Sequence, residues 1–301
     1  MAESIERRII RRLARFLKHS PGRTVAQGEP IRATVVEVLR RSTSRRWNTY
    51  VVGGAVRDLL LGPRGSWPRD VDVIVEGCSE HELEDAFGDI LVRRNSFGGL
   101  HLRRTVGIGR PAAVNYELLF DVWRLQDTWG IKTRGLAPTI SSFLTTPFLN
   151  IDSIAVVLPD DIRQLTVYEN GFSEAVVTRT LEINSELNPF PFVCAVRSLI
   201  LAAKLDFWLG PRLASFIHTL MKSASVTELM KAQISHYGQI RCQEDDIKGW
   251  ISNMRVQLEV GPQKVRLLST PQRQTHLWRD WPPRTDSREE ESGAKRQSLA
   301  S

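Results

Sequence analysis

Residues 50–77 constrain the fold more than any other part of the chain and read YVVGGAVRDLLLGPRGSWPRDVDVIVEG. A β-rich segment ends at a pair of glycines, an apolar segment suited to a helix follows, and a second β-rich segment begins after a loop. This order predicts a strand, a turn, a short helix and a second strand. The glycine turn and the second strand therefore belong to one βαβ-sized unit.

Asp70 and Asp72 stand two residues apart on the second predicted strand. Because side chains alternate between the two faces of a strand, these two carboxylates point to the same side. Their Cα atoms are about 6–7 Å apart at a rise of about 3.3 Å per residue. Both carboxylates can share one or two Mg²⁺ ions, which prefer carboxylate and phosphate oxygens. The alternative is a polar strand edge without a ligand.

Gly53 and Gly54 break the chain between the first strand and the predicted helix at 55–61. Glycines let a backbone approach a ligand closely, and the free N–H groups at a helix start attract anions. Arg57 would add a positive charge for a phosphate, or would pair with Asp58 or Asp70 instead. The turn and the paired carboxylates together favour a nucleotide and metal site.

The motifs GGAVRD at 53–58 and DVD at 70–72 resemble the head-domain signature of the class II nucleotidyltransferases. This family comprises the bacterial poly(A) polymerases and the CCA-adding tRNA nucleotidyltransferases. The resemblance extends from about residue 46 to residue 207. Further similar segments are FGGL at 97–100, NIDSIA at 150–155 (Thr-Ile-Asn-Ala in the family) and AVRSLILAAKLDF at 195–207, which resembles the neck helix.

The segment DVWRL at 121–125 resembles the strand that carries the family's third catalytic carboxylate. The resemblance therefore implies that Asp70, Asp72 and Asp121 are the catalytic and metal-binding residues. It also implies a nucleotide-binding role for the glycine motif. The residues concerned are Gly53, Gly54, Arg57 and Asp58.

The chain departs from the family in two motifs. Members that add CCA carry Arg-Arg-Asp before the Thr-Ile-Asn-Ala segment, where this chain has TTPFL at 145–149. They also present a Glu-Asp-x-x-Arg neck motif to the base, whereas the acidic run at 244–246 lacks the matching arginine. The helical region is too short for the family's body and tail domains. The base and the acceptor are left open.

Periodicity predicts the remaining elements. The fold that the resemblance implies is α+β, with a mixed-sheet nucleotidyltransferase head (a polymerase β-like palm) followed by a small all-α neck. The predicted domains are basic N-terminal helices at 1–45, the head at 46–187, the neck at 188–267 and a largely disordered tail at 268–301. The predicted strands are 91–106 (a hairpin around 97–99), 114–125, 150–158 and 163–168, and the predicted helices are 5–18, 31–39, 79–90, a short one within 139–148, 191–205, 211–222, 226–238 and 243–258.

Charge favours polyanionic partners. The chain has 41 Lys and Arg against 34 Asp and Glu, a net charge of +7, and an isoelectric point near 9.6, which points first to nucleic acid. The segment 5–18 predicts a basic amphipathic helix that docks on the domain, with RNA, a membrane surface or an organelle transit role as alternatives. Arg40, Arg41, Arg45 and Arg46 are candidates for contacts with an acceptor backbone, or a solvated loop.

Cysteines and hydropathy bear on location. The three cysteines, Cys78, Cys194 and Cys242, are too widely spaced for a disulfide framework or a metal pair, which fits a reducing cytoplasm. No apolar run approaches the roughly 20 residues that a membrane-spanning helix needs. We therefore expect a cytoplasmic protein without a transmembrane segment.

The activity that the resemblance implies is a Mg²⁺-dependent, template-independent transfer of a nucleoside monophosphate from a nucleoside triphosphate to a hydroxyl group. The favoured acceptor is an RNA 3′ end, of tRNA or another RNA. Alternatives are a protein, a small molecule or a nucleotide as acceptor, or a non-catalytic RNA-binding or assembly protein on this fold. The short helical region also leaves room for a homo-oligomer or a partner subunit.

Overall fold

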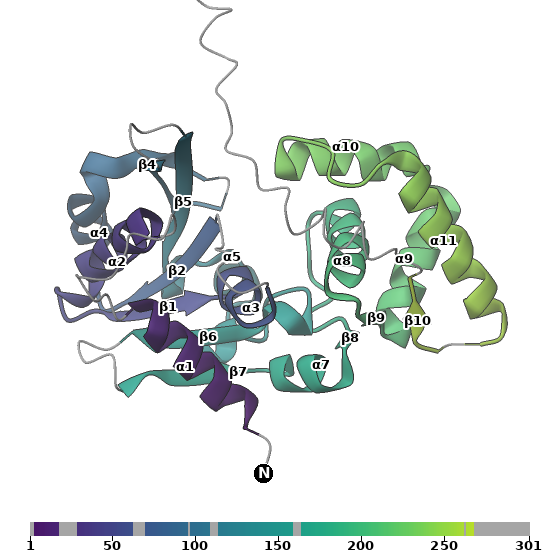
Figure 1. Ribbon diagram of the computed structural model, residues 1–301, viewed down its shortest axis with the longest axis horizontal. Helices are drawn as coiled ribbons and strands as arrows, with labels where there is room; N and C mark the ends of the chain where they lie inside the picture. Colours follow the sequence, from purple (N-terminus) through teal and green to yellow (C-terminus); the bar gives the residue numbers. More distant parts are fainter. Residues whose placement is uncertain are drawn as a thin grey trace, which may run out of the picture.

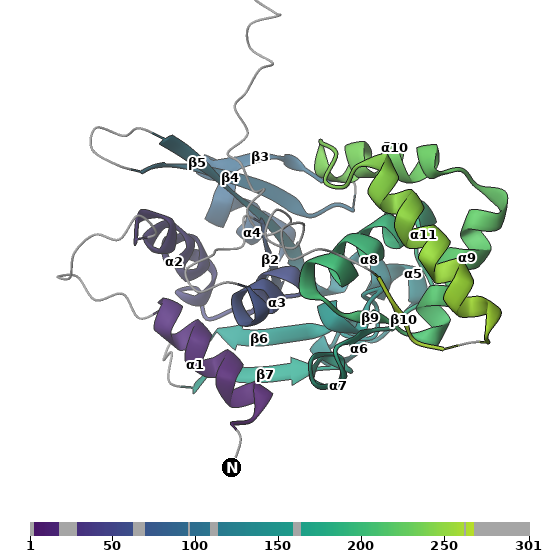
Figure 2. The same ribbon diagram turned by 45° about the vertical axis from the view of Figure 1, so that its right-hand side comes forward.

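The computed structural model describes residues 3–17, 29–62, 70–95, 97–108, 114–158, 164–261 and 263–267. In these ranges a seven-stranded sheet carries helices on its faces, and a group of helices lies beside it (Figures 1 and 2). The elements in chain order are α1 (Ile5–Leu17), α2 (Glu29–Thr43), β1 (Asn48–Val52), α3 (Gly54–Leu61), β2 (Asp70–Glu76), α4 (Glu80–Phe87), β3 (Leu91–Arg94), β4 (Leu100–Ile108), β5 (Val114–Arg124), α5 (Trp129–Arg134), α6 (Ile140–Phe143), β6 (Ile154–Leu158), β7 (Thr166–Glu169), α7 (Phe172–Thr178), β8 (Thr180–Leu181), α8 (Pro191–Leu205), β9 (Trp208–Leu209), α9 (Pro211–Ser223), α10 (Val226–Tyr237), α11 (Glu244–Glu259) and β10 (Val265–Arg266).

The large sheet is mixed. Its strand order is β3-β4-β5-β2-β1-β6-β7, in which β2 and β5 run parallel and every other neighbouring pair is antiparallel. Helices precede, interrupt and follow these strands along the chain. The predicted α+β fold with a mixed sheet is therefore confirmed.

The two faces of the sheet pack against different helices. On one face, side chains such as Val73 and Phe120 belong to the main hydrophobic core together with residues of α2, α3 and α4. On the other face, Val52 and Ile74 form a second, smaller cluster with Leu144 and other residues in and around α6. Side chains of the segment 114–125 alternate between the two faces of the sheet, and one set of them is fully buried in the main core. That set is Leu118, Phe120 and Val122.

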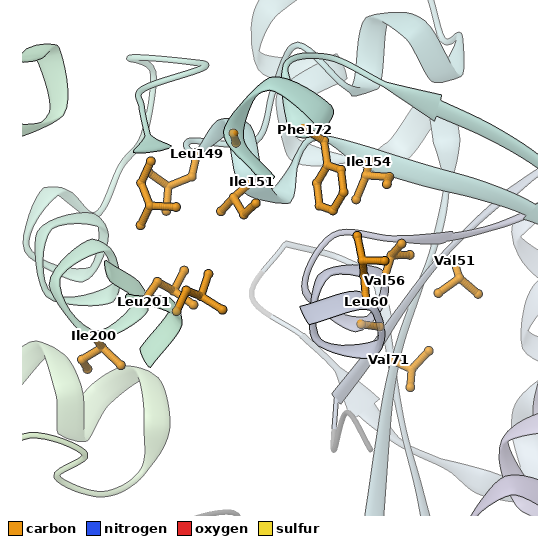
Figure 3. Close-up of a cluster of buried hydrophobic side chains, with 14 of the residues drawn as sticks. Val51, Val56, Leu60, Val71, Leu149, Ile151, Ile154, Phe172, Ile200 and Leu201 are labelled. Atoms are coloured by element: carbon orange, nitrogen blue, oxygen red, sulfur yellow. The ribbon is translucent and has the colours of Figure 1, made fainter. Parts of the chain in front are cut away.

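The main core continues from the sheet into α8 (Figure 3). Val56 and Leu60 of α3 belong to the same buried cluster as Ile200 and Leu201 of α8. Ile151, just before β6, is also a member. Burying a side chain of this size stabilises the fold by about 1.5–3 kcal/mol. The helical region and the sheet therefore share apolar surface rather than forming separate cores.

The four helices after residue 190 begin close to the predicted positions because their start signals are local. Pro191 and Pro211 occupy the first helical positions of α8 and α9, where the missing N–H group costs nothing. Ser225 and Glu228 form a capping box at α10. β8 before these helices, β9 between α8 and α9, and β10 after α11 form a small sheet that the pattern did not predict, since two-residue strands leave no periodicity.

Helix α1 docks its apolar stripe on the protein, as the first of the alternatives predicted. Ile9 and Leu13 are buried, whereas Arg11 is exposed. Arg12 donates hydrogen bonds to the carbonyl oxygens of Leu59 (2.9 Å) and Leu60 (2.6 Å). Since these carbonyls lie in the last turn of α3, α1 satisfies groups that the helix itself leaves open.

The predicted basic segment before β1 is largely helical. Arg40 and Arg41 lie in α2, which extends to Thr43, beyond the predicted end at residue 39. Arg41 donates to Glu37 at 3.2 Å and to Asp89 at 3.0 Å. Arg41 is therefore used to join α2 to the turn after α4.

Other element boundaries differ from the prediction for physical reasons. Residues 150–152 form a 3₁₀ turn rather than the start of a strand, because the Asn150 side chain binds the backbone of Thr180 and Glu182. The predicted helix 79–90 ends as an α-helix at Phe87 and continues as a 3₁₀ turn. Helices α5 and α7 were not predicted, because six or seven residues carry too little periodicity.

No helix in the described ranges is both long and apolar enough to cross a bilayer. The predicted tail at 268–301 and the first residue of the predicted strand 163–168 lie outside the described residues.

Candidate active site

The structure brings together the three carboxylates that the sequence singled out. In the parallel pairing of β2 with β5, Asp72 lies opposite Asp121 and Asp70 lies opposite Leu119. Paired residues on neighbouring strands, about 4.8 Å apart, point to the same face of a sheet, and residues i and i+2 share that face as well. Asp70, Asp72 and Asp121 therefore project from one face.

Asp72 stands in a surplus of negative charge. Burial raises its pKa to about 7, and the neighbouring Asp121 carboxylate adds to this effect. The guanidinium of Arg197 acts in the opposite direction, while Asp70 and Asp152 raise the pKa further. A cation placed between these carboxylates would relieve their repulsion.

The glycine turn passes beside Asp72. Gly53 has φ +63° and ψ −128°, a conformation that residues with a Cβ atom rarely adopt. A Cβ atom added at Gly53 would lie 3.9 Å from Asp72 Oδ2 and 3.7 Å from the Asp152 carbonyl oxygen. The Gly53 N–H group donates to the Ile154 carbonyl at 3.0 Å, which ties the turn to β6.

Helix α3 begins at Gly54, directly after this turn. The first N–H groups of any α-helix lack acceptors within the helix, and the helix dipole adds partial positive charge there. The N-terminus of α3 therefore offers donors for an anion close to Asp72.

Arg57 and Asp58 are buried and engaged with protein groups, the alternative that the sequence left open. Their exposed fractions are 6% and 7%. Arg57 donates from Nε to Asp58 Oδ1 at 2.8 Å and from Nη1 to Asp152 Oδ1. Any influence of these two side chains on a nucleotide would pass through the turn that they hold in place.

Three further charged residues interact with Arg57 and Asp58 or with each other, and the sequence analysis did not name them as site residues. Asp152 lies in the 3₁₀ turn before β6, and Arg197 of α8 donates to its Oδ2 at 2.8 Å. Lys204 of α8 donates to Asp58 Oδ2 at 3.1 Å. We call Arg57, Asp58, Asp152, Arg197 and Lys204 the ionic network. The signal was present, since both segments, 150–155 and 195–207, resemble family motifs.

Electrostatics favour the charged form of most members of the ionic network. Burial opposes ionisation of Asp58, but Arg57 and Lys204 outweigh it and lower its pKa. Asp152 raises the pKa of Arg197. Burial lowers the pKa of Lys204 to about 8, although Asp58 acts to raise it. The network therefore keeps Asp58 and the two guanidinium groups charged between the sheet and α8.

Asp121 is oriented by two side chains that the sequence reasoning also missed. His101 Nδ1 lies 2.9 Å from Asp121 Oδ1, and Asn95 Nδ2 donates to the same oxygen at 3.1 Å. His101 faces Asp121 across the β4–β5 ladder. Only the strand register reveals this contact, because the two residues are twenty positions apart.

The carboxylates fit a Mg²⁺ ion held jointly with a substrate. Among the described residues, no three His, Cys, Asp or Glu side chains form a group that could hold a metal ion alone. Mg²⁺ usually keeps several waters and is bound by one or two carboxylates plus substrate phosphates. Asp70 and Asp72 satisfy that requirement, and the neighbouring carboxylates of Asp121 and Asp152 add to the negative charge around Asp72.

Solved structures similar to this chain are tRNA-processing enzymes. One such enzyme in a complex is 20% identical, covers 74% of this chain and 57% of its own, and gives a TM-score of 0.48. The Thermotoga maritima CCA-adding enzyme with tRNA is 17% identical over 82% of this chain and 62% of its own, with a TM-score of 0.43. A tRNA nucleotidyltransferase with a primer tRNA and an ATP analogue is 22% identical over 74% and 62%, with a TM-score of 0.47.

This chain spans less than two thirds of the length of each of these three proteins. No protein-family profile matches the chain, and no curated protein matches it.

Proposed function

We propose that this protein is a Mg²⁺-dependent, template-independent nucleotidyltransferase that moves a nucleoside monophosphate from a nucleoside triphosphate to the hydroxyl of an RNA 3′ end. The observation that carries the proposal is the pairing of Asp72 with Asp121 on the face that also bears Asp70. The glycine turn at Gly53 lies against the Asp72 carboxylate. Carboxylates and an anion-binding helix start, brought together in this way, are what transfer of a phosphoryl-type group requires.

Each part of the site has a role in this mechanism. The first turn of α3 would bind triphosphate oxygens through backbone N–H groups. Asp70 and Asp72 would hold Mg²⁺, which when bound offsets charge on the triphosphate and on the departing pyrophosphate. Asp121, fixed by His101 and Asn95, would share in metal binding and accept the proton of the attacking hydroxyl.

Catalysis of this kind depends on positioning, and the ionic network supports it. Arg57 and Asp152 are bound to each other beneath the glycine turn, and Arg197 binds the second oxygen of Asp152. These contacts fix the turn relative to α8. We propose on this basis that residues 46–187 act as the nucleotidyltransferase head and 188–267 as its neck.

An RNA acceptor is supported by the net charge of +7 and by the similarity to solved tRNA-processing enzymes, two of which hold tRNA. Exposed arginines of α1 and α2 add positive surface that suits a phosphate backbone. A cytoplasmic location agrees with the buried, free cysteines.

A second candidate is transfer to a non-RNA acceptor. The acidic run Glu244, Asp245 and Asp246 forms the first turn of α11, where carboxylates stabilise a helix through its dipole. Its structural role there accounts for the three side chains without base reading. This observation favours a site that reads its acceptor differently from the CCA-adding enzymes.

The proposal is tested by incubating the purified protein with each labelled nucleoside triphosphate and Mg²⁺. Each reaction is run with total RNA and without RNA. RNA-dependent labelling that is lost in Asp70→Ala and Asp72→Ala variants supports transfer to RNA. Labelling of protein or small molecules without RNA supports the second candidate. No turnover under any condition, in wild type and variants alike, would rule out both.

A further inference from the structure

Three aromatic rings from separate elements meet at the turn between β3 and β4. Phe97 lies in the turn between β3 and β4, Trp129 begins α5, and Phe190 directly precedes α8. The Phe97 ring centroid lies 6.3 Å from that of Trp129 and 6.0 Å from that of Phe190, both in edge-to-face arrangement. We call these three residues the aromatic cluster. Phe97 is 38% exposed and Phe190 is 48% exposed, so ring surface remains open to solvent.

The turn that carries Phe97 is fixed to the third carboxylate. Asn95 Oδ1 accepts hydrogen bonds from the backbone N–H groups of Phe97 (3.0 Å) and Gly99 (2.9 Å). The Nδ2 group of the same side chain donates to Asp121 Oδ1. One amide side chain therefore sets the position of the Phe97 backbone relative to Asp121.

Phe190 is held from the other side. Its N–H group donates to Asn188 Oδ1 at 2.8 Å, and its carbonyl accepts from the Cys194 N–H group at 3.0 Å. Phe190 is thus anchored at the start of α8, the helix that carries Arg197. The aromatic cluster spans the junction of the hairpin, α5 and α8 next to the candidate site.

A positive charge, that of Arg93, lies on the face of the sheet that bears Asp121. Arg93 of β3 is opposite His101 of β4, which in turn is opposite Asp121 of β5. Residues paired in this way share a face, and Arg93 is exposed. Single-stranded nucleic acid is bound by open aromatic surface that stacks bases, together with cations that attract phosphates.

We propose that the aromatic cluster stacks the terminal base of a single-stranded RNA 3′ end and thereby presents the terminal hydroxyl to Asp121. This inference rests on the proposed nucleotidyltransferase function and adds the means by which the acceptor is held. Stacking accepts any base, because every base has an apolar face. Stacking would therefore bind RNA acceptors that end in different bases.

The test measures the acceptor separately from the nucleotide. Short RNAs carrying 2-aminopurine at the 3′ end report stacking by fluorescence quenching, without turnover. Variants Phe97→Ala and Phe190→Ala each remove a ring. Phe97→Leu keeps apolar volume without an aromatic face, whereas Phe97→Trp keeps an aromatic face. Tyr168→Ala is the matched control, since Tyr168 is 39% exposed on β7, at the opposite edge of the sheet. Thermal unfolding confirms that each variant is folded.

We expect quenching with wild type, Phe97→Trp and Tyr168→Ala, and weak quenching with the other three variants. Affinity for the RNA should fall by roughly tenfold in Phe97→Ala and in Phe190→Ala. The KM for the nucleoside triphosphate should stay unchanged.

Equal RNA affinity in wild type and both alanine variants would overturn the inference. So would a Phe97→Leu variant as effective as wild type, which would show that apolar contact, rather than stacking on a ring, holds the RNA. If wild type quenches the probe but transfers no nucleotide, the proposed function fails while the RNA-binding surface stands. If wild type transfers nucleotide to RNA without quenching, the stacking proposal alone fails.

Discussion

Lys204 Nζ lies 3.1 Å from Asp58 Oδ2, and both side chains are buried. The pair joins α8 to α3 across 146 positions of sequence. Asp58 also accepts from Arg57, the neighbour that binds Asp152 beneath the glycine turn. The geometry of the candidate site is therefore tied to a buried contact with the helical region.

Breaking this pair should cost stability. Lys204→Met keeps most of the side-chain volume but leaves Asp58 with Arg57 as its remaining cation. Removing one partner of a buried ion pair destabilises a protein by about 3–5 kcal/mol, and we expect a loss near the lower end because Arg57 remains. Urea unfolding of wild type and variant measures it.

The double variant Asp58→Asn with Lys204→Met is the control for this pair. It should lose less than the sum of the two single variants, because it leaves no unpaired buried charge. Strict additivity would show that the two groups do not interact in solution.

Replacing Asp72 should separate stability from activity. Burial and nearby carboxylates raise the pKa of Asp72 to about 7, so the ionised form is disfavoured in the folded protein. Asp72→Asn should stabilise the metal-free protein at pH 8 by about 1–4 kcal/mol, taking about 1.4 kcal/mol for each unit of pKa shift. The same variant should lose nucleotide transfer, because a metal ligand is gone.

The pH dependence of stability follows from the same shift. Between the unfolded pKa near 3.8 and the folded pKa of about 7, the folded state binds more protons than the unfolded state. The contribution of Asp72 to stability therefore falls as pH rises through this window. The difference in unfolding free energy between Asp72→Asn and wild type should grow from pH 4 to pH 7 and then level off. A difference that is independent of pH would contradict the raised pKa.

Magnesium with bound nucleotide should offset the loss of stability that ionised Asp72 causes. A ligand that binds only the folded state adds about 2.7 kcal/mol at a hundred times its Kd. We expect Mg²⁺ with a non-hydrolysable triphosphate to raise the Tm of wild type and to leave that of Asp70→Ala nearly unchanged. Arg41→Ala, which alters a surface contact with Asp89, should respond to the ligands as wild type does. A shift of the same size in Asp70→Ala would exclude Asp70 as a ligand.

The sequence could predict the parts of the site that depend on neighbours along the chain. The common face of Asp70 and Asp72 follows from strand alternation, and the glycine turn follows from residue type. Asp121 needed the family resemblance, because its place beside Asp72 depends on the β2–β5 register. The main sheet strands and the capped helices were predicted for the same local reasons.

The contacts that pattern could not reveal are those between distant segments. Asp152, Arg197 and Lys204 reach the site through packing of α8 on the sheet, and no spacing in the sequence encodes that packing. His101 finds Asp121 through the hairpin register. Short elements such as α5 and α7 were missed because packing, rather than periodicity, determines them.

Gly53 tests how closely the turn must approach the carboxylates. Its φ of +63° strains any residue with a Cβ atom, and a non-glycine residue held in such a conformation costs about 1–3 kcal/mol. A Cβ atom there has room, since its nearest neighbours would lie at 3.7 Å and 3.9 Å. Gly53→Ala should therefore lose stability through backbone strain rather than through a clash.

If the protein relieves that strain by shifting the turn, the start of α3 moves away from Asp72. We then expect the KM for nucleoside triphosphate to rise in Gly53→Ala while affinity for RNA stays unchanged. Gly135→Ala is the matched control, because Gly135 has φ +60° at the end of α5, with no atom within 4 Å of its Cβ position among the described residues. Its stability loss should be smaller, because Gly135 has the left-handed helical ψ of 35° that other residues tolerate better, and its KM should be normal. Equal KM values in both variants would show that Gly53 serves the fold alone.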